Sequence, residues 1–100
     1  MTDPRKLIRV LLDPKERLDE RMEAAWYLGE YDDPDVEQAL RQVAVDYSAH
    51  TWLAHNVGDS LGDIWTRAGR RDTALMARMH PAARAAAQRY RDVRGTFIAP

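Results

Sequence analysis

A pattern that repeats at a separation of 33 residues constrains this chain more than any other feature of its sequence. The Leu-Gly pair at 28–29 returns at 61–62, and the segment before each pair repeats at the same separation. In that preceding segment, Leu7, Val10, Leu11 and Asp13 recur as Leu40, Val43, Ala44 and Asp46. A third and weaker copy contains Met76 and Ala77. A fixed period of this size is typical of helical solenoids, in which each repeat is a small unit of helices.

The spacing of apolar residues predicts an all-α fold with six helices in three antiparallel pairs. Apolar residues recur every three or four positions, as in Leu53, Val57, Leu61 and Ile64, and no long stretch alternates with the period of a strand. Three repeats are about the minimum that can bury a continuous core by stacking. Gly58 and Gly62 lie inside the fourth predicted helix, where each costs about 1 kcal/mol relative to alanine. Their presence indicates close approach of another helix or of a ligand, and of the two we expect another helix.

Capping and breaking residues predict where these helices begin and end. Asp3, Asp13 and Ser48 are the expected caps of the first, second and fourth helices, with proline following each aspartate. An Asp-Asp-Pro break at 32–34 separates the first pair from the second. The fourth helix is expected to end at Gly69, the fifth at His80 before a proline, and the sixth at Gly95.

The length of 100 residues and the hydrophobic content of 45% predict a single domain with one core. We expect this domain to span residues 1–95 and residues 96–100 to form a flexible tail. The chain contains no cysteine, which excludes disulfides and thiolate metal sites and fits a reducing compartment. No signal-peptide pattern occurs near the amino end, and no apolar run approaches the roughly 20 residues that cross a bilayer. We therefore expect a soluble cytoplasmic protein.

The net charge of −1 hides an asymmetry between the two halves of the chain. Residues 1–50 contain 7 Lys and Arg against 12 Asp and Glu, whereas residues 51–100 contain 8 against 4. The first half is therefore acidic and the second half basic. This asymmetry is compatible with two solvated faces or with a surface that steers a charged partner, and the sequence leaves both open.

The segment RMEAAWYLGEYDDP at 21–34, with its related segment AHNVGDSLGDIW at 54–65, resembles a HEAT-like repeat, especially the short variety named after the phycobilisome lyases. The resemblance implies a short right-handed α-α superhelix of about three helix pairs, in the HEAT or armadillo class. It also implies that the second helix of each pair lines a concave surface. The buried side of these helices would contain Ala24, Ala25, Leu28, Val57, Gly58 and Leu61.

The same resemblance implies which residues form the concave surface. In the first two repeats they include Asp19, Met22, Glu23, Trp26, Glu30, Trp52, His55, Asn56, Asp59 and Asp63, and in the last repeat Arg84, Gln88, Arg91 and Asp92. Large rigid aromatics beside carboxylates suit a protein-binding patch, because the aromatics supply contact area and the charges select the partner. The alternative is that the tryptophans fill gaps between helices. We expect this of any single one among Trp26, Trp52 and Trp65, but not of all three.

A HEAT-like enzyme, deoxyhypusine hydroxylase, provides an alternative function. Its repeats carry His-Glu pairs that bind two irons, whereas the corresponding pairs here are Met22-Glu23 and His55-Asn56. Each retains one of the two ligands. Glu23 and His55 could still share a metal across neighbouring helices, and Asp59 lies one helical turn from His55. Metal sites with open catalytic positions generally need three protein ligands. No HExxH, GxSxG, phosphate-binding loop or dinucleotide motif occurs, so we expect no metal, no cofactor and no enzymatic activity.

Nucleic-acid binding is the other alternative. The last predicted helix carries Arg84, Arg91 and Arg94 on one face, and some HEAT-like proteins bind DNA backbones with such arginines. However, the isoelectric point of about 6.3 is lower than expected of a nucleic-acid-binding domain, and the acidic half would repel phosphate. The sequence favours a non-enzymatic protein-interaction module that binds a basic protein. Such a small chain resembles bacterial adaptors and the cytoplasmic immunity proteins that neutralise toxins.

Overall fold

The computed structural model describes the backbone of residues 3–98 and the side chains of residues 3–89. Within that backbone there are six helices and no strand. The helices are α1 (Pro4–Leu12), α2 (Leu18–Leu28), α3 (Pro34–Ala44), α4 (Thr51–Ala68), α5 (Thr73–Met76) and α6 (Pro81–Ile98). The prediction of an all-α fold is confirmed.

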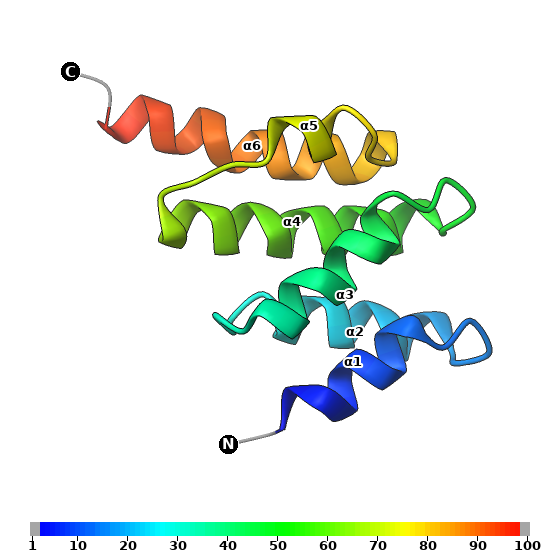
Figure 1. Ribbon diagram of the computed structural model, residues 1–100. Coiled ribbons are helices and arrows are strands. Elements are labelled where there is room, and N and C mark those ends of the chain that lie inside the picture. Colours follow the sequence, from blue (N-terminus) through cyan, green and yellow to red (C-terminus); the bar gives the residue numbers. More distant parts are fainter. Residues whose placement is uncertain (1–2, 99–100) are drawn as a thin grey trace.

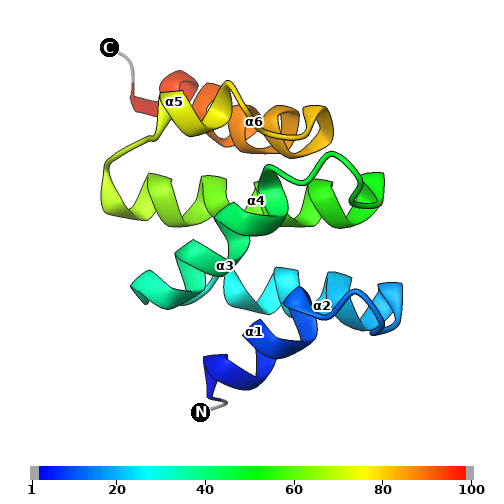
Figure 2. The ribbon, with the colours of Figure 1, turned by 45° about the vertical axis from the view of Figure 1, so that its right-hand side comes forward.

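The helices form two layers, with the even-numbered helices in one layer and the odd-numbered helices in the other (Figures 1 and 2). Helices α2, α4 and α6 lie side by side and run in the same direction, and α1, α3 and α5 cross them on one side. This arrangement leaves the opposite side of α2 and α4 uncovered by any other described helix.

Local chemistry explains several of the helix boundaries. Asp3 and Asp33 each accept a hydrogen bond from the backbone N–H two residues later, and a proline follows each of them at the start of α1 and α3. Gly69 ends α4 in the left-handed region with φ of 70°, as predicted.

Other predicted boundaries are wrong. Asp13 does not cap α2: its carboxylate accepts the N–H of Lys15 in a turn, and α2 begins only at Leu18. The cap of α4 is His50 rather than Ser48, because the His50 Nδ1 atom accepts the N–H of Trp52 at 3.1 Å. The hydroxyl of Ser48 instead donates to the Asp46 carboxylate.

The third pair also differs from its prediction. Helix α5 has four residues and ends at Met76, before the predicted break at His80. Helix α6 continues past Gly95 to Ile98, so the predicted tail of residues 96–100 lies partly within α6 and partly outside the described residues. The short α5 lies in the third and weakest copy of the sequence repeat.

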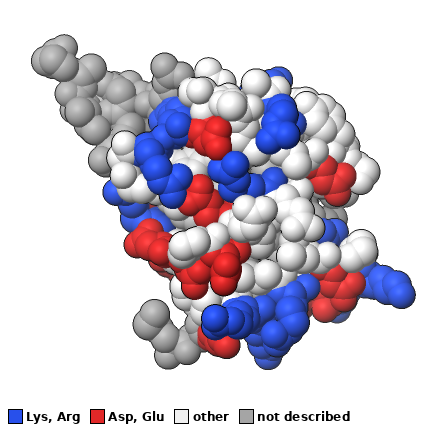
Figure 3. Space-filling view, in the orientation of Figure 1, with Lys and Arg blue, Asp and Glu red and all other residues white. Residues whose placement is uncertain are grey.

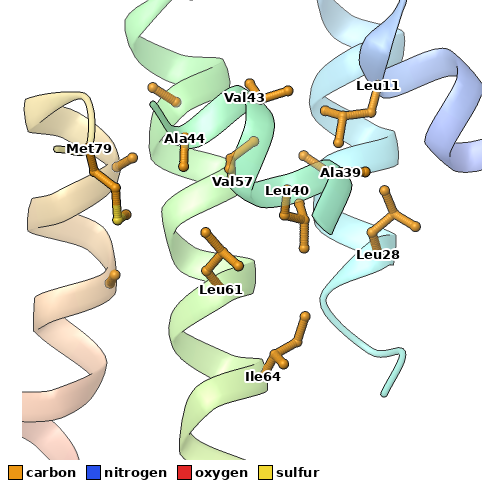
Figure 4. Packing of buried hydrophobic residues seen from close by; sticks show 14 of the residues in the cluster. Leu11, Leu28, Ala39, Leu40, Val43, Ala44, Val57, Leu61, Ile64 and Met79 are labelled. Carbon is orange, nitrogen blue, oxygen red and sulfur yellow. The ribbon is translucent and has the colours of Figure 1, made fainter. Parts of the chain in front are cut away.

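The core lies between the two layers. Leu40 of α3 lies between α2 and α4, with Leu28 on one side and Leu61 on the other (Figure 4), and all three side chains are fully buried. Burying one leucine side chain contributes about 1.5–3 kcal/mol to folding. The residues predicted for the buried side of α2 and α4, Ala24, Ala25, Leu28, Val57, Gly58 and Leu61, are all buried.

Gly58 allows α4 and α6 to pack closely. A methyl group added at Gly58 would overlap with the backbone carbonyl of Ala83 in α6 and approach the Ala83 Cα to 2.6 Å. Backbone atoms cannot move aside as a flexible side chain can. The expectation of close helix packing at Gly58 is confirmed.

Candidate functional site

The uncovered side of α2 and α4, which we call the α2–α4 face, exposes two tryptophans. The exposed fraction is 62% for Trp26 of α2 and 66% for Trp52 of α4. Trp65, in contrast, is 1% exposed and packs in the core. The three tryptophans therefore divide between two exposed side chains and one that fills the interior. Exposed tryptophan is unusual enough on a folded surface to mark a candidate binding site.

Hydrogen bonds between α2 and α4 hold this face together. The Ser60 hydroxyl donates to the Ala25 carbonyl at 2.5 Å, and the Asn56 side-chain amide donates to the Met22 carbonyl at 3.2 Å. Gly29 provides the space for Ser60, since a methyl group at Gly29 would lie 2.6 Å from the Ser60 hydroxyl oxygen. Asn56, predicted as a partner-binding residue, thus contributes a contact between the two helices.

A small hollow lies beside Trp26. Its volume is about 150 Å³, and its lining residues are Trp26, Gly29, Glu30, Asp59, Ser60 and Asp63. Four of these residues are predicted site residues, which the fold brings together from α2, the turn after it, and α4. An aromatic ring with three carboxylates around one hollow suits a lysine or arginine side chain.

A larger and less charged hollow lies beside Trp52. Its volume is about 430 Å³, and its lining residues are Met22, Thr51, Trp52, His55, Asn56 and Ala82. Ala82 belongs to α6, which therefore closes one end of the α2–α4 face. The mixture of thioether, indole and methyl groups suits an apolar side chain of a partner.

Ion pairs make the α2–α4 face less acidic than the sequence predicts. Asp59 accepts a hydrogen bond from Arg89 of α6 at 2.8 Å, and the His55 Nε2 atom lies 3.8 Å from its carboxylate. Asp63 pairs with Arg67 at 3.0 Å. Arg89 was not among the predicted site residues, although it lies 33 residues after Asn56 and so occupies the equivalent position of the next repeat.

The remaining acidic residues of the site lie on α2 and in the turn that directly follows it. Asp19 pairs with Arg17 at 2.9 Å on the exposed surface. Glu23 and Glu30 are exposed, and neither has an ion-pair partner among the side chains that the structure describes. These two carboxylates provide the uncompensated negative charge of the α2–α4 face.

The two alternative functions, metal-dependent catalysis and nucleic-acid binding, require other groups of side chains. Among the described residues, no three His, Asp or Glu side chains are close enough together to hold a metal ion, including those around His55 and Glu23. Arg84 is half-buried on α6, and the side chains of Arg91 and Arg94 lie outside the described residues.

A second polar cluster joins α3 to the end of α4. Glu37 is buried in α3, where its carboxylate accepts the Trp65 indole N–H at 3.0 Å and two hydrogen bonds from Arg70. The hydrogen bond from Arg70 lowers the pKa of Glu37 below its usual value, against the opposite effect of burial. Arg41 links the cluster to Asp72 at 2.8 Å. No motif or spacing in the sequence indicated this cluster, because its residues come from separate helices and loops.

Comparison with known proteins does not identify the chain: no family model, curated protein or solved structure matches it. Among the described residues, no helix is both long enough and apolar enough to cross a membrane.

Proposed function

We propose that this chain is a small HEAT-like α-solenoid, with the right-handed superhelix of that class, whose function is to bind a basic partner protein without catalysis. The observation that carries the proposal is the exposure of Trp26 and Trp52, each beside a hollow on the same face. Tryptophans near the centre of an interface commonly contribute most of its binding energy.

The chemistry of the two hollows supports a basic partner. A lysine or arginine of the partner would enter the hollow beside Trp26, where Glu30 adds negative charge that no ion pair with a described side chain compensates. An apolar residue of the partner would enter the hollow beside Trp52. Glu23 and Glu30 would mainly accelerate association, as charges at the rim of an interface do.

The narrower role within this function is that of a bacterial immunity protein, located in the cytoplasm, that neutralises a basic toxin domain such as a nuclease. The surplus negative charge on α2 supports it, because nuclease domains present basic surfaces to their substrates. A toxin gene directly upstream of this one is the expected gene arrangement. A position inside a metabolic operon would contradict the role as an immunity protein. It would not bear on the binding function, which the next experiment tests.

The binding function is tested by a pull-down from the native host with matched variants. We expect Trp26→Ala and Trp52→Ala each to weaken capture of a basic protein by at least about 2 kcal/mol, typical of an interface hot spot. Tyr47→Ala is the matched control, because Tyr47 is also 62% exposed but does not line either hollow. We expect this control to retain binding.

The same experiment separates protein binding from nucleic-acid binding. Arg84→Ala should leave capture of a basic protein unchanged. A loss of capture in Arg84→Ala but not in the tryptophan variants, or recovery of nucleic acid instead of protein, would overturn the proposal. Melting temperatures of all variants must agree with the wild type before a loss is assigned to the interface.

A further inference from the structure

A second concave surface lies in the other layer of the molecule, between α1 and α3. Its volume is about 370 Å³. Ile8 and Leu12 of α1 and Ala39 of α3 form its apolar part, and Arg5, Arg9, Asp35, Gln38 and Gln42 form its walls. We call this surface the α1–α3 groove. It shares no residue with the α2–α4 face.

The apolar part of the α1–α3 groove follows one side of α1. Ile8 and Leu12 lie one helical turn apart, and both side chains are half-buried, so each keeps part of its surface exposed in the groove. Ala39 is small and 3% exposed, which leaves space between the two helices. An apolar strip of this kind on paired helices suits the apolar side of another helix.

The charge of α1 selects the kind of helix that would fit. Arg5, Lys6 and Arg9 lie on α1, which contains no acidic residue. Positive charge gathers over α1 at the lower edge of Figure 3. Arg5 approaches Asp3 only at 3.6 Å, in a pair that is more than half exposed. Among the described side chains, Lys6 and Arg9 have no ion-pair partner, so these cations remain available to an acidic ligand.

We propose that the α1–α3 groove binds an acidic amphipathic helix of a protein partner. The apolar side of that helix would cover Ile8, Leu12 and Ala39, and its carboxylates would pair with Arg5 and Arg9. A nucleic-acid backbone would satisfy the arginines but would leave the apolar strip without a complementary surface. This proposal is independent of the proposed function. Together the two surfaces would let the chain join a basic protein to an acidic one.

The test uses a fluorescein-labelled helical peptide of about 15 residues, with leucines at i, i+4, i+7 and i+11 and glutamates on both sides of that stripe. We expect fluorescence anisotropy to show binding of this peptide. A peptide with the same leucines and lysines in place of the glutamates should bind more weakly, and so should a glutamate peptide with scrambled leucines. A short labelled DNA duplex provides the comparison with a polyanion.

Two matched variants locate the binding. Arg9→Glu should lower the affinity for the acidic peptide by about tenfold or more, because it reverses a charge on the wall of the groove. Lys6→Glu makes a similar charge change on the same helix but outside the groove, and it should change the affinity by less than about twofold. Ile8→Ala tests the apolar strip and should also weaken binding, while far-UV circular dichroism verifies that each variant is folded.

Four outcomes would overturn the proposal. The first is the absence of binding by the acidic peptide. The second is an equal loss in Arg9→Glu and Lys6→Glu, which would indicate diffuse charge attraction rather than a groove. The third is tighter binding of the DNA duplex or the lysine peptide. The fourth is a lower molecular mass in solution for Arg9→Glu than for the wild type, which would assign the groove to a second copy of this chain.

Discussion

At the scale of single residues, the same side-chain type has different roles in different parts of the fold. Trp65 is buried and its indole N–H donates to Glu37, whereas Trp26 and Trp52 are exposed and make no such bond to a described residue. A buried tryptophan needs a partner for its N–H, and Glu37 provides that acceptor at a site where Arg70 balances its charge. The role of each tryptophan thus follows from the groups around it.

The pKa of Glu37 predicts how stability depends on pH. Because the hydrogen bond from Arg70 lowers the folded-state pKa, the ionised form stabilises the fold. This contribution is complete above the unfolded value of about 4.3 and is lost as pH falls through the folded value. Glu37→Gln should therefore reduce the free energy of unfolding at neutral pH by about 1–2 kcal/mol, a modest figure because Arg70 is half-exposed.

Urea unfolding across a range of pH measures this effect. The difference between wild type and Glu37→Gln should become smaller as the pH falls below about 4. Glu20→Gln is the matched control, since Glu20 is exposed and forms no ion pair with a described side chain, and it should change stability little at any pH. A constant difference between wild type and Glu37→Gln at every pH would show that the carboxylate charge is not the cause.

At the scale of helices, pairs that share the same layer pack by different means. Helices α2 and α4 are joined by hydrogen bonds from Ser60 and Asn56 to carbonyls of α2. Helices α4 and α6 meet through small residues, with Gly58 against the backbone of Ala83. The contact at Gly58 depends on shape and therefore tolerates no additional atom, although the ion pair between Arg89 and Asp59 also joins α4 to α6.

The close contact at Gly58 predicts the effect of adding one methyl group. In an isolated helix, Gly58→Ala would add about 1 kcal/mol of stability. In this protein the methyl group would meet the backbone of α6, and overpacking of this kind typically costs about 1–3 kcal/mol. We expect Gly58→Ala to lower the melting temperature measured by circular dichroism. A higher melting temperature would contradict the close approach of α4 and α6.

At the scale of the whole molecule, one hydrophobic core contains described side chains from each of the six helices. The buried cluster contains Leu11 of α1, Leu28 of α2, Val36 of α3, Leu61 of α4, Leu75 of α5 and Ala83 of α6. A continuous core means that no pair of helices can lose its packing without exposing apolar surface of its neighbours. The repeats of this short chain are therefore expected to depend on one another.

This continuity predicts cooperative unfolding. Loss of helix, measured by circular dichroism, and exposure of the buried Trp65, measured by fluorescence, should follow one transition with the same urea midpoint. Because Trp26 and Trp52 are already exposed, a variant with both replaced by phenylalanine isolates the signal of Trp65. Two separate midpoints would indicate that the pair α5 and α6 unfolds independently of the rest.

The helical class, the prolines that open α1 and α3, and the end of α4 at Gly69 could be predicted from the sequence, because these features depend on short-range hydrogen bonds and backbone geometry. The sequence also indicated the buried side of α2 and α4, since apolar spacing along one helix defines its buried side. Even local chemistry was ambiguous where several residues could cap the same helix, as at Ser48 and His50. Three features could be seen only in the folded molecule: the burial of Trp65 among the tryptophans, the ion pair of Arg89 with Asp59, and the contact of Glu37 with Arg70. Each of these depends on how one helix is shifted and rotated against another, and that relation results from packing of the whole core rather than from any one segment.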